Sequence, residues 1–127
     1  MAHILLVDDD DLLRDTVQQL LEIDEYRVSA AAHGVQALDL LQQDSSIGLL
    51  ITDILMPGMH GAQLIVEARH LRPLLPIIAI SGGRRVLSAR FSLATADLAG
   101  ATCQLPKPFG QHELRAALRQ ALAGVAA

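Results

Sequence analysis

Short apolar runs alternate with longer amphipathic stretches along the chain. The runs predict strands, and apolar residues spaced three or four apart in the stretches predict helices. The expected strands cover about 3–7, 26–31, 47–52, 76–80 and 102–105, and the expected helices cover about 10–23, 34–43, 61–71, 86–99 and 111–123. Strands without polar alternation are typical of a parallel sheet that is buried on both faces. The pattern therefore predicts an α/β fold, a doubly wound five-stranded parallel sheet with helices on both faces.

The helical stretches also predict which side chains face the sheet. Asp10 or Asp11 is the expected N-cap of the first helix, because a short carboxylate side chain accepts hydrogen bonds from the first unpaired N–H groups. The expected inward positions of the second and third helices are Val35, Leu38, Leu41, Leu64, Ile65, Ala68 and Leu71.

Length and composition narrow the function classes. A chain of 127 residues with 51% hydrophobic positions predicts a single domain with a sizeable core. The net charge of −4 argues against a nucleic-acid-binding surface, which would be basic. Cys103 is the only cysteine, so neither a disulfide framework nor a zinc site is expected. The sequence shows no signal peptide and no apolar run of membrane-spanning length, so we expect a cytoplasmic protein without a membrane partner.

Charged or hydroxyl side chains follow four of the expected strands. Asp8 and Asp9 follow the first strand, Asp53 ends the third, Ser81 ends the fourth and Lys107 follows the fifth. The carboxyl ends of parallel strands share one edge of the sheet, where such folds bind ligands. Three carboxylates there would repel one another unless a cation lay between them, and a hard divalent ion such as Mg²⁺ prefers oxygen ligands. An ammonium group and a hydroxyl beside it would suit a phosphoryl group.

Lys107 is distinctive for a second reason, since it is the only lysine among ten basic residues. A lysine ammonium is a compact point charge on a flexible stem, whereas arginine presents a planar fork. Its place at a strand end, before Pro108 and Phe109, therefore favours a specific role over a leftover surface charge.

Four blocks at these strand ends, taken in order, resemble the response-regulator receiver domains of bacterial two-component signalling. The blocks are Ile4–Asp9, Thr52–Gly61, Ile80–Gly82 and Lys107–Phe109, and the resemblance runs from about His3 to Leu122. It implies a flavodoxin-like sheet of strand order 2-1-3-4-5. It also implies one receiver domain over residues 1–127, with no output domain.

The resemblance implies a role for each site residue. Asp53 would accept a phosphoryl group on its carboxylate. Lys107 would pair first with that carboxylate and then with the phosphoryl group, and Ser81 would hydrogen-bond a phosphoryl oxygen. The implied Mg²⁺ ligands are Asp9, Asp53 and the backbone carbonyl of Leu55, with Asp8 acting through water, whereas Asp10 is expected to lie outside the set.

The resemblance further implies a phosphoacceptor switch and no turnover enzyme, although the domain would assist its own phosphorylation and dephosphorylation. The phosphoryl donor would be a sensor histidine kinase or a histidine phosphotransfer protein. Output would come from a downstream protein that docks near helix 86–99 and strand 102–105, or from passing the phosphoryl group on in a phosphorelay.

Two other functions fit parts of the pattern. A Mg²⁺-dependent phosphatase could use Asp8 as nucleophile with Asp10 two residues later, but that chemistry usually needs a cap domain, for which this length leaves no room. An interaction domain that is never phosphorylated would not need the acidic pair or the lysine. Steady phosphomonoester turnover would favour the phosphatase, and absence of Mg²⁺ binding would favour the interaction domain.

Two positions depart from the family pattern. Gln104 stands three residues before Lys107, where the family usually has a tyrosine or phenylalanine that swings inward, so the usual aromatic switch is not expected. The segment between Ser81 and Lys107 is longer than usual, with the extra residues around Gly82–Arg85, so the output surface is expected to be unusual. The Lys107–Pro108 bond is expected to be cis, because it forms a tight turn.

The histidines show no metal-ligand spacing. They are scattered at His3, His33, His60, His70 and His112, and we expect structural or surface roles for them.

The residues two positions after Asp53 and two after Ser81 predict a long-lived phosphorylated state. In the family these positions flank the path of the attacking water, and here they are Leu55 and Gly83, which offer no polar side chain to orient it. We expect Leu55→Asn to lose its phosphoryl group faster than the wild type, measured as phosphate release from labelled protein. Equal or faster release from the wild type would contradict the water-orientation argument.

Overall fold

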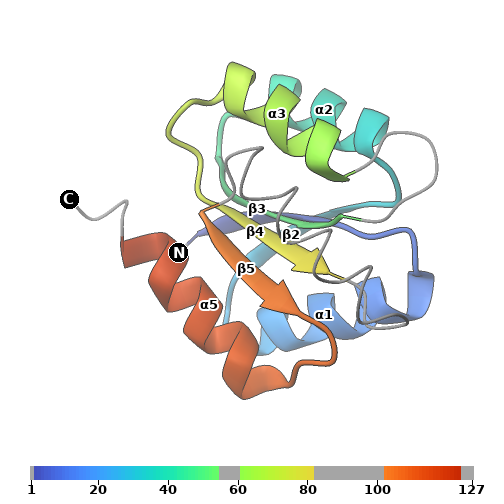
Figure 1. Ribbon diagram of the computed structural model, residues 1–127, viewed down its shortest axis with the longest axis vertical. Helices are drawn as coiled ribbons and strands as arrows, with labels where there is room; N and C mark the ends of the chain where they lie inside the picture. Colours follow the sequence, from blue (N-terminus) through green and yellow to red (C-terminus); the bar gives the residue numbers. More distant parts are fainter. Residues whose placement is uncertain (1, 55–60, 82–101, 124–127) are drawn as a thin grey trace.

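The computed structural model describes residues 2–54, 61–81 and 102–123. Five parallel strands form one sheet in the order β2-β1-β3-β4-β5, which confirms the expected fold class and strand order (Figure 1). The strands are β1 (His3–Val7), β2 (Arg27–Ala31), β3 (Ile47–Asp53), β4 (Ile77–Ser81) and β5 (Cys103–Pro106). The described helices are α1 (Asp11–Ile23), α2 (Gly34–Gln43), α3 (Gly61–Leu71) and α5 (Gln111–Ala123). The helix expected at 86–99 lies outside the described residues.

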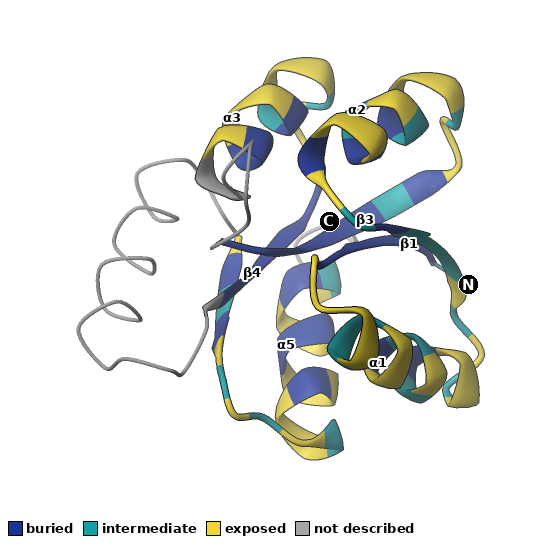
Figure 2. Cartoon of the chain, turned by 90° about the vertical axis from the view of Figure 1, so that its right-hand side faces the viewer, coloured by how far each residue is buried: buried dark blue, intermediate teal, exposed yellow. Residues whose placement is uncertain are grey.

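Within the described part of the chain, two helices cover each face of the sheet, and each pair packs on its own apolar core. Figure 1 shows α2 and α3 on one face and α1 and α5 on the other. Successive residues of β1 point to opposite faces, so Leu5 belongs to the α2–α3 core and Leu6 to the α1–α5 core. All five residues of β1 are buried. This two-sided burial explains why the strands read as continuous apolar runs, and Figure 2 shows the exposed positions on the outward sides of the helices.

The helix boundaries follow the predicted pattern closely, whereas two inward positions were predicted wrongly. Asp10 is the N-cap of α1, and its carboxylate accepts from the backbone N–H groups of Leu12 and Leu13. Val35 was expected to be buried but is 57% exposed, because the buried positions of α2 are Gly34, Ala37 and Leu41. The inward face of α2 therefore starts one residue earlier, about 100° around the helix.

Leu71 is the second wrong position. It is the last residue of α3 and is 42% exposed. Leu38 and Leu122 pack against the cores but are only partly buried.

No helix among residues 2–54, 61–81 and 102–123 is long and apolar enough to cross a membrane. Cys103 is a buried free thiol, and this burial raises its pKa.

His3 ties three segments together at the amino edge of the sheet. Its ring is 5% exposed, with Nδ1 2.8 Å from the Ser46 hydroxyl and Nε2 2.7 Å from the Ser29 hydroxyl. The Ser46 hydroxyl donates in turn to Asp44 Oδ1 at 2.6 Å, so it accepts from Nδ1–H. This chain of hydrogen bonds joins β1, the edge strand β2 and the turn before β3, which is the structural role expected for this histidine.

We expect His3→Ala to lower the free energy of unfolding by about 2–3 kcal/mol, because it opens a cavity at a buried position and removes two side-chain hydrogen bonds. Urea unfolding followed by far-UV circular dichroism measures the change. His112→Ala, at an exposed position of α5, is the control and should stay within about 0.5 kcal/mol of the wild type. Equal stability of the two variants would contradict a structural role for His3.

Candidate functional site

The register of the sheet brings the strand ends named in the sequence to one edge. Val7 pairs with Thr52, Asp53 pairs with Ile80, and Ser81 pairs with Pro106. The residues that directly follow these pairs therefore lie side by side at the carboxyl edge. The backbone N–H of Ile54 donates to the Ile80 carbonyl at 2.9 Å, which holds the end of β3 in place beyond Asp53.

Three carboxylates converge at this edge. One oxygen from each of Asp8, Asp9 and Asp53 lies within 4.8 Å of the others. Asp8 is 1% and Asp53 4% exposed, whereas Asp9 is open to solvent. Two buried carboxylates with a third at the rim form an oxygen-only donor set with an open side, which fits a hard cation such as Mg²⁺ that keeps several waters. Asp8, Asp9 and Asp53 would hold that ion, and their oxygen donors fit the cofactor expected from the sequence.

Lys107 lies among these carboxylates. Its Nζ is 2.8 Å from Asp53 Oδ2 and 3.9 Å from Asp8 Oδ2, and its side chain is 19% exposed. The ammonium group offsets part of the negative charge where solvent cannot. The Lys107–Pro108 peptide bond is cis, as expected.

The surroundings of Asp8 disfavour the ionised form of its carboxyl group. Burial is the largest cause that raises its pKa, from 3.8 to about 6. The Asp10 backbone N–H, which donates to Asp8 Oδ1 at 2.9 Å, and the Lys107 charge lower the pKa in part, while Asp53 and Asp9 raise it further. At neutral pH the folded chain therefore holds a carboxylate that would ionise more easily in the unfolded chain.

The rest of the acidic run serves α1. The carboxylate of Asp10 is 3.1 Å from the N–H groups of both Leu12 and Leu13, so it is committed to the helix cap and lies outside the cluster. Asp11 forms an ion pair with Arg14 at 2.6 Å. Asp9, and not Asp10, therefore lies with Asp8 and Asp53 in the carboxylate cluster, and its role as a metal ligand stays a prediction.

Other predicted site positions are only partly described. Ser81 is the last residue of β4, next to the end of β5, which is the place expected for it. Leu55, Gly83 and the Gly82–Arg85 stretch lie outside the described residues, so the carbonyl ligand expected from Leu55 stays a prediction. Gln104 is half-buried in β5 opposite Ala79. It occupies the position where the family usually has a tyrosine or phenylalanine.

Sequence reasoning missed one residue, Arg14. Its guanidinium donates to the backbone carbonyl of Asp8 at 2.6 Å and to the Asp11 carboxylate at 2.6 Å. The spacing gave a usable signal, because Arg14 follows Asp11 by three residues and Asp10 by four, so it lies one helical turn above the acidic run.

The raised pKa of Asp8 yields a stability prediction for protein without divalent ions. Asp8→Asn keeps an oxygen that can accept from the Asp10 N–H but removes the buried charge. We expect the free energy of unfolding to rise by about 3 kcal/mol at pH 7.5, at about 1.4 kcal/mol per pKa unit. Because the folded-state pKa is the higher one, this gain should vanish as the pH falls from about 6 towards 4, where the folded carboxyl is already protonated.

Urea unfolding of both proteins in chelator, at pH 7.5 and 4.5, measures the effect. Asp39→Asn, at an exposed position of α2, is the matched control and should change stability by less than about 0.5 kcal/mol at either pH. A variant that is no more stable than the wild type at pH 7.5 would show that Asp8 carries no such penalty.

Comparisons with known proteins agree on one family. The profile of the response regulator receiver domain matches residues 4–119. The transcriptional regulatory protein CpxR of Escherichia coli (strain K12) is 38% identical over 122 residues, which cover 96% of this chain and 50% of CpxR. Response regulator MprA of Mycobacterium bovis (strain BCG / Pasteur 1173P2) is 38% identical over 124 residues, covering 95% and 50%. The chain thus spans about half the length of these curated relatives.

Solved structures show the same fold over nearly the full chain. A response regulator receiver domain protein from Clostridium thermocellum superposes with a TM-score of 0.86 at 27% identity, covering 99% of this chain and 98% of that one. The chemotaxis protein CheY4 of Vibrio cholerae gives a TM-score of 0.84 at 29% identity, covering 96% and 99%. Together with the profile match over most of the sequence, these similarities show that the chain belongs to the response-regulator receiver-domain family.

Proposed function

We propose that Asp53 accepts a phosphoryl group from a sensor histidine kinase or a histidine phosphotransfer protein, and that the domain acts as a phosphorylation-dependent switch. The observation that carries the proposal is the setting of Asp53. It ends a central strand, is 4% exposed, lies 2.8 Å from Lys107 Nζ, and shares a cluster within 4.8 Å with Asp8 and Asp9.

In the proposed reaction an oxygen of the Asp53 carboxylate bonds to phosphorus while the bond from phosphorus to the donor's imidazole nitrogen breaks. The nitrogen keeps the electron pair of that bond. Such transfers depend on positioning and on neutralising the phosphoryl oxygens. Asp9, Asp53 and Asp8, with the Leu55 carbonyl, would hold Mg²⁺, which supplies positive charge beside those oxygens when bound. Lys107 supplies a second positive charge from β5, and Ser81 would hydrogen-bond a phosphoryl oxygen.

The alternative of a phosphatase with Asp8 as nucleophile is less well supported by the geometry. Burial raises the pKa of Asp8 to about 6, so this carboxylate is harder to ionise than an ordinary aspartate. Asp10, the partner carboxylate that such an enzyme would need, is bound to the first turn of α1. Asp53, in contrast, is already paired with the one lysine of the chain.

We further propose that output depends on a downstream protein that docks near residues 86–99, for which the sequence predicts a helix, and β5. Lys107 directly follows β5, and β5 is an edge strand of the sheet. A change in the charge at Asp53 therefore acts on this edge through the Lys107 ion pair. Passing the phosphoryl group on to a histidine phosphotransfer protein is the other output that this chemistry allows.

The phosphoacceptor assignment predicts that Asp53→Asn takes up no label from acetyl phosphate in Mg²⁺, because an amide is not a nucleophile for phosphorus. Intact-protein mass spectrometry gives the readout. Asp39→Asn, a substitution of the same kind at an exposed position of α2, should be labelled like the wild type. Full labelling of the Asp53 variant would contradict the assignment of Asp53 as phosphoacceptor. Absence of label on the wild type would favour an interaction domain that is never phosphorylated.

A further inference from the structure

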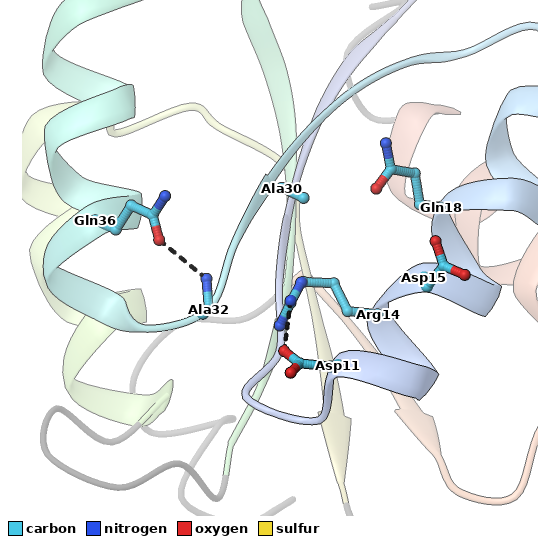
Figure 3. Close-up of a pocket in the computed structure, with 7 residues that line it drawn as sticks. All are labelled: Asp11, Arg14, Asp15, Gln18, Ala30, Ala32 and Gln36. Atoms are coloured by element: carbon cyan, nitrogen blue, oxygen red, sulfur yellow. Dashed lines mark hydrogen bonds and ion pairs between the residues drawn. The ribbon is translucent and has the colours of Figure 1, made fainter.

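Arg14 joins the first helix to the backbone of the acidic loop. Its Nη1 donates to the Asp8 carbonyl at 2.6 Å, and its Nη2 donates to Asp11 Oδ1 at 2.6 Å. The side chain is 20% exposed, so most of it is packed. Figure 3 shows the guanidinium turned towards Asp11 at the start of α1. The arginine thus clamps the loop between the end of β1 and the helix that follows.

The bond to the Asp8 carbonyl acts on the position of Asp9. That carbonyl belongs to the peptide unit that joins Asp8 to Asp9, and a peptide unit is planar. Holding its oxygen from α1 fixes the plane from which Asp9 departs. The neighbouring restraints act on either side of Asp9, since the Asp8 N–H donates to Ala31 at 3.2 Å and the Asp10 N–H donates to Asp8 Oδ1 at 2.9 Å.

The loop needs this restraint because it holds like charges close together. Three carboxylates within 4.8 Å repel one another, and Asp9, at the exposed rim, is the one that can swing away into water. A cation site works best when its ligands are held in place before the ion arrives, and residues that orient the ligands affect affinity strongly.

We propose that Arg14 is a positioning residue for divalent-cation binding, which holds the Asp8–Asp9 peptide so that the Asp9 carboxylate faces Asp8 and Asp53. The proposal rests on the Mg²⁺ site of the proposed function. The direction of the change in cation affinity distinguishes this role from a simple effect of charge, because a nearby positive charge would by itself weaken cation binding. Loss of Arg14 therefore weakens binding if the residue positions Asp9, and strengthens binding if only its charge matters.

The surroundings of Arg14 allow a chemical rescue. The side chain lines a solvent-open cavity of about 330 Å³ between α1, the end of β2 and α2, together with Asp15, Gln18, Ala30 and Gln36 (Figure 3). Truncation of Arg14 enlarges this space beside the Asp8 carbonyl. A free guanidinium ion could then enter and donate to the same oxygen.

The test is Mn²⁺ binding to the full chain, followed by the electron paramagnetic resonance of the free ion and competed with Mg²⁺. Arg14→Ala should bind roughly tenfold more weakly or worse than the wild type. Arg14→Lys, which keeps the charge but can make only one of the two bonds well, should fall between them. Arg119→Ala, which removes an exposed arginine from α5, is the charge-matched control and should bind like the wild type.

Guanidinium chloride at low millimolar concentration should restore part of the affinity of Arg14→Ala and none of that of Asp9→Ala, which lacks the ligand itself. Hydrogen exchange gives a readout without metal, since the Asp10 amide should exchange faster in Arg14→Ala. If that variant does not fold by circular dichroism, Arg14→Lys carries the test: it keeps the charge and should still bind more weakly than the wild type.

Unchanged or tighter Mn²⁺ binding by Arg14→Ala, with normal binding by the wild type, would overturn the positioning role and leave the proposed function intact. Failure of the wild type to bind Mn²⁺ would instead overturn the metal site, and with it both proposals.

Discussion

The ion pair between Lys107 and Asp53 is the interaction around which the carboxyl edge of this sheet is organised. An ammonium 2.8 Å from a 4%-exposed carboxylate lies where water screens little, so each charge depends on the other. Asp8 and Asp9 add negative charge within 4.8 Å of Asp53, and one lysine cannot balance three carboxylates. The residual negative charge makes this edge a place for a cation, and it also makes Asp8 hard to ionise. Burial is the largest cause that raises the pKa of Asp8 to about 6, and the negative charges of Asp53 and Asp9 add to it.

The doubly wound sheet explains why these charges meet. Strands buried on both faces have no room for polar side chains along their length, as the apolar run of β1 illustrates. In the inner strands β1, β3 and β4, charged residues lie only where the strand leaves the core. In a parallel sheet with this register, all such exits on one side lie together, so residues 45 and 54 positions apart in sequence reach the same few ångströms. The fold gathers the site without any local sequence motif that spans it.

This link between apolar runs and strand ends explains why so much could be predicted from the sequence. Helices α2, α3 and α5 begin and end at the predicted residues, and α1 begins one residue later than predicted, because the apolar spacing and the helix-ending residues agree there. Asp8, Asp9, Asp53 and Lys107 were found because each follows an apolar run. Val35 and Leu71 were misplaced because periodicity defines a helical face only to about one residue, and packing against the sheet decides the rest. Arg14 was missed for another reason: its spacing indicates the bond to Asp11, but its second acceptor is the backbone carbonyl of Asp8, which no residue pattern reveals. The role of Leu55 and of the stretch around Gly83 rests on family resemblance alone.

The two ends of β1 show how one strand can serve stability and function separately. At the amino end, His3 is buried with every ring nitrogen paired, in a chain of hydrogen bonds that stabilises the edge strand β2. At the carboxyl end, Asp8 is equally buried but surrounded by like charge, which costs stability unless a cation or a proton arrives. The interior of the strand between them is 0–1% exposed and transmits no polar contact. Packing and hydrogen bonds elsewhere in the same strand offset the cost of burying Asp8. The acidic edge can therefore keep more negative charge than Lys107 balances. A bound cation, or a phosphoryl group on Asp53, would change that charge where it matters most.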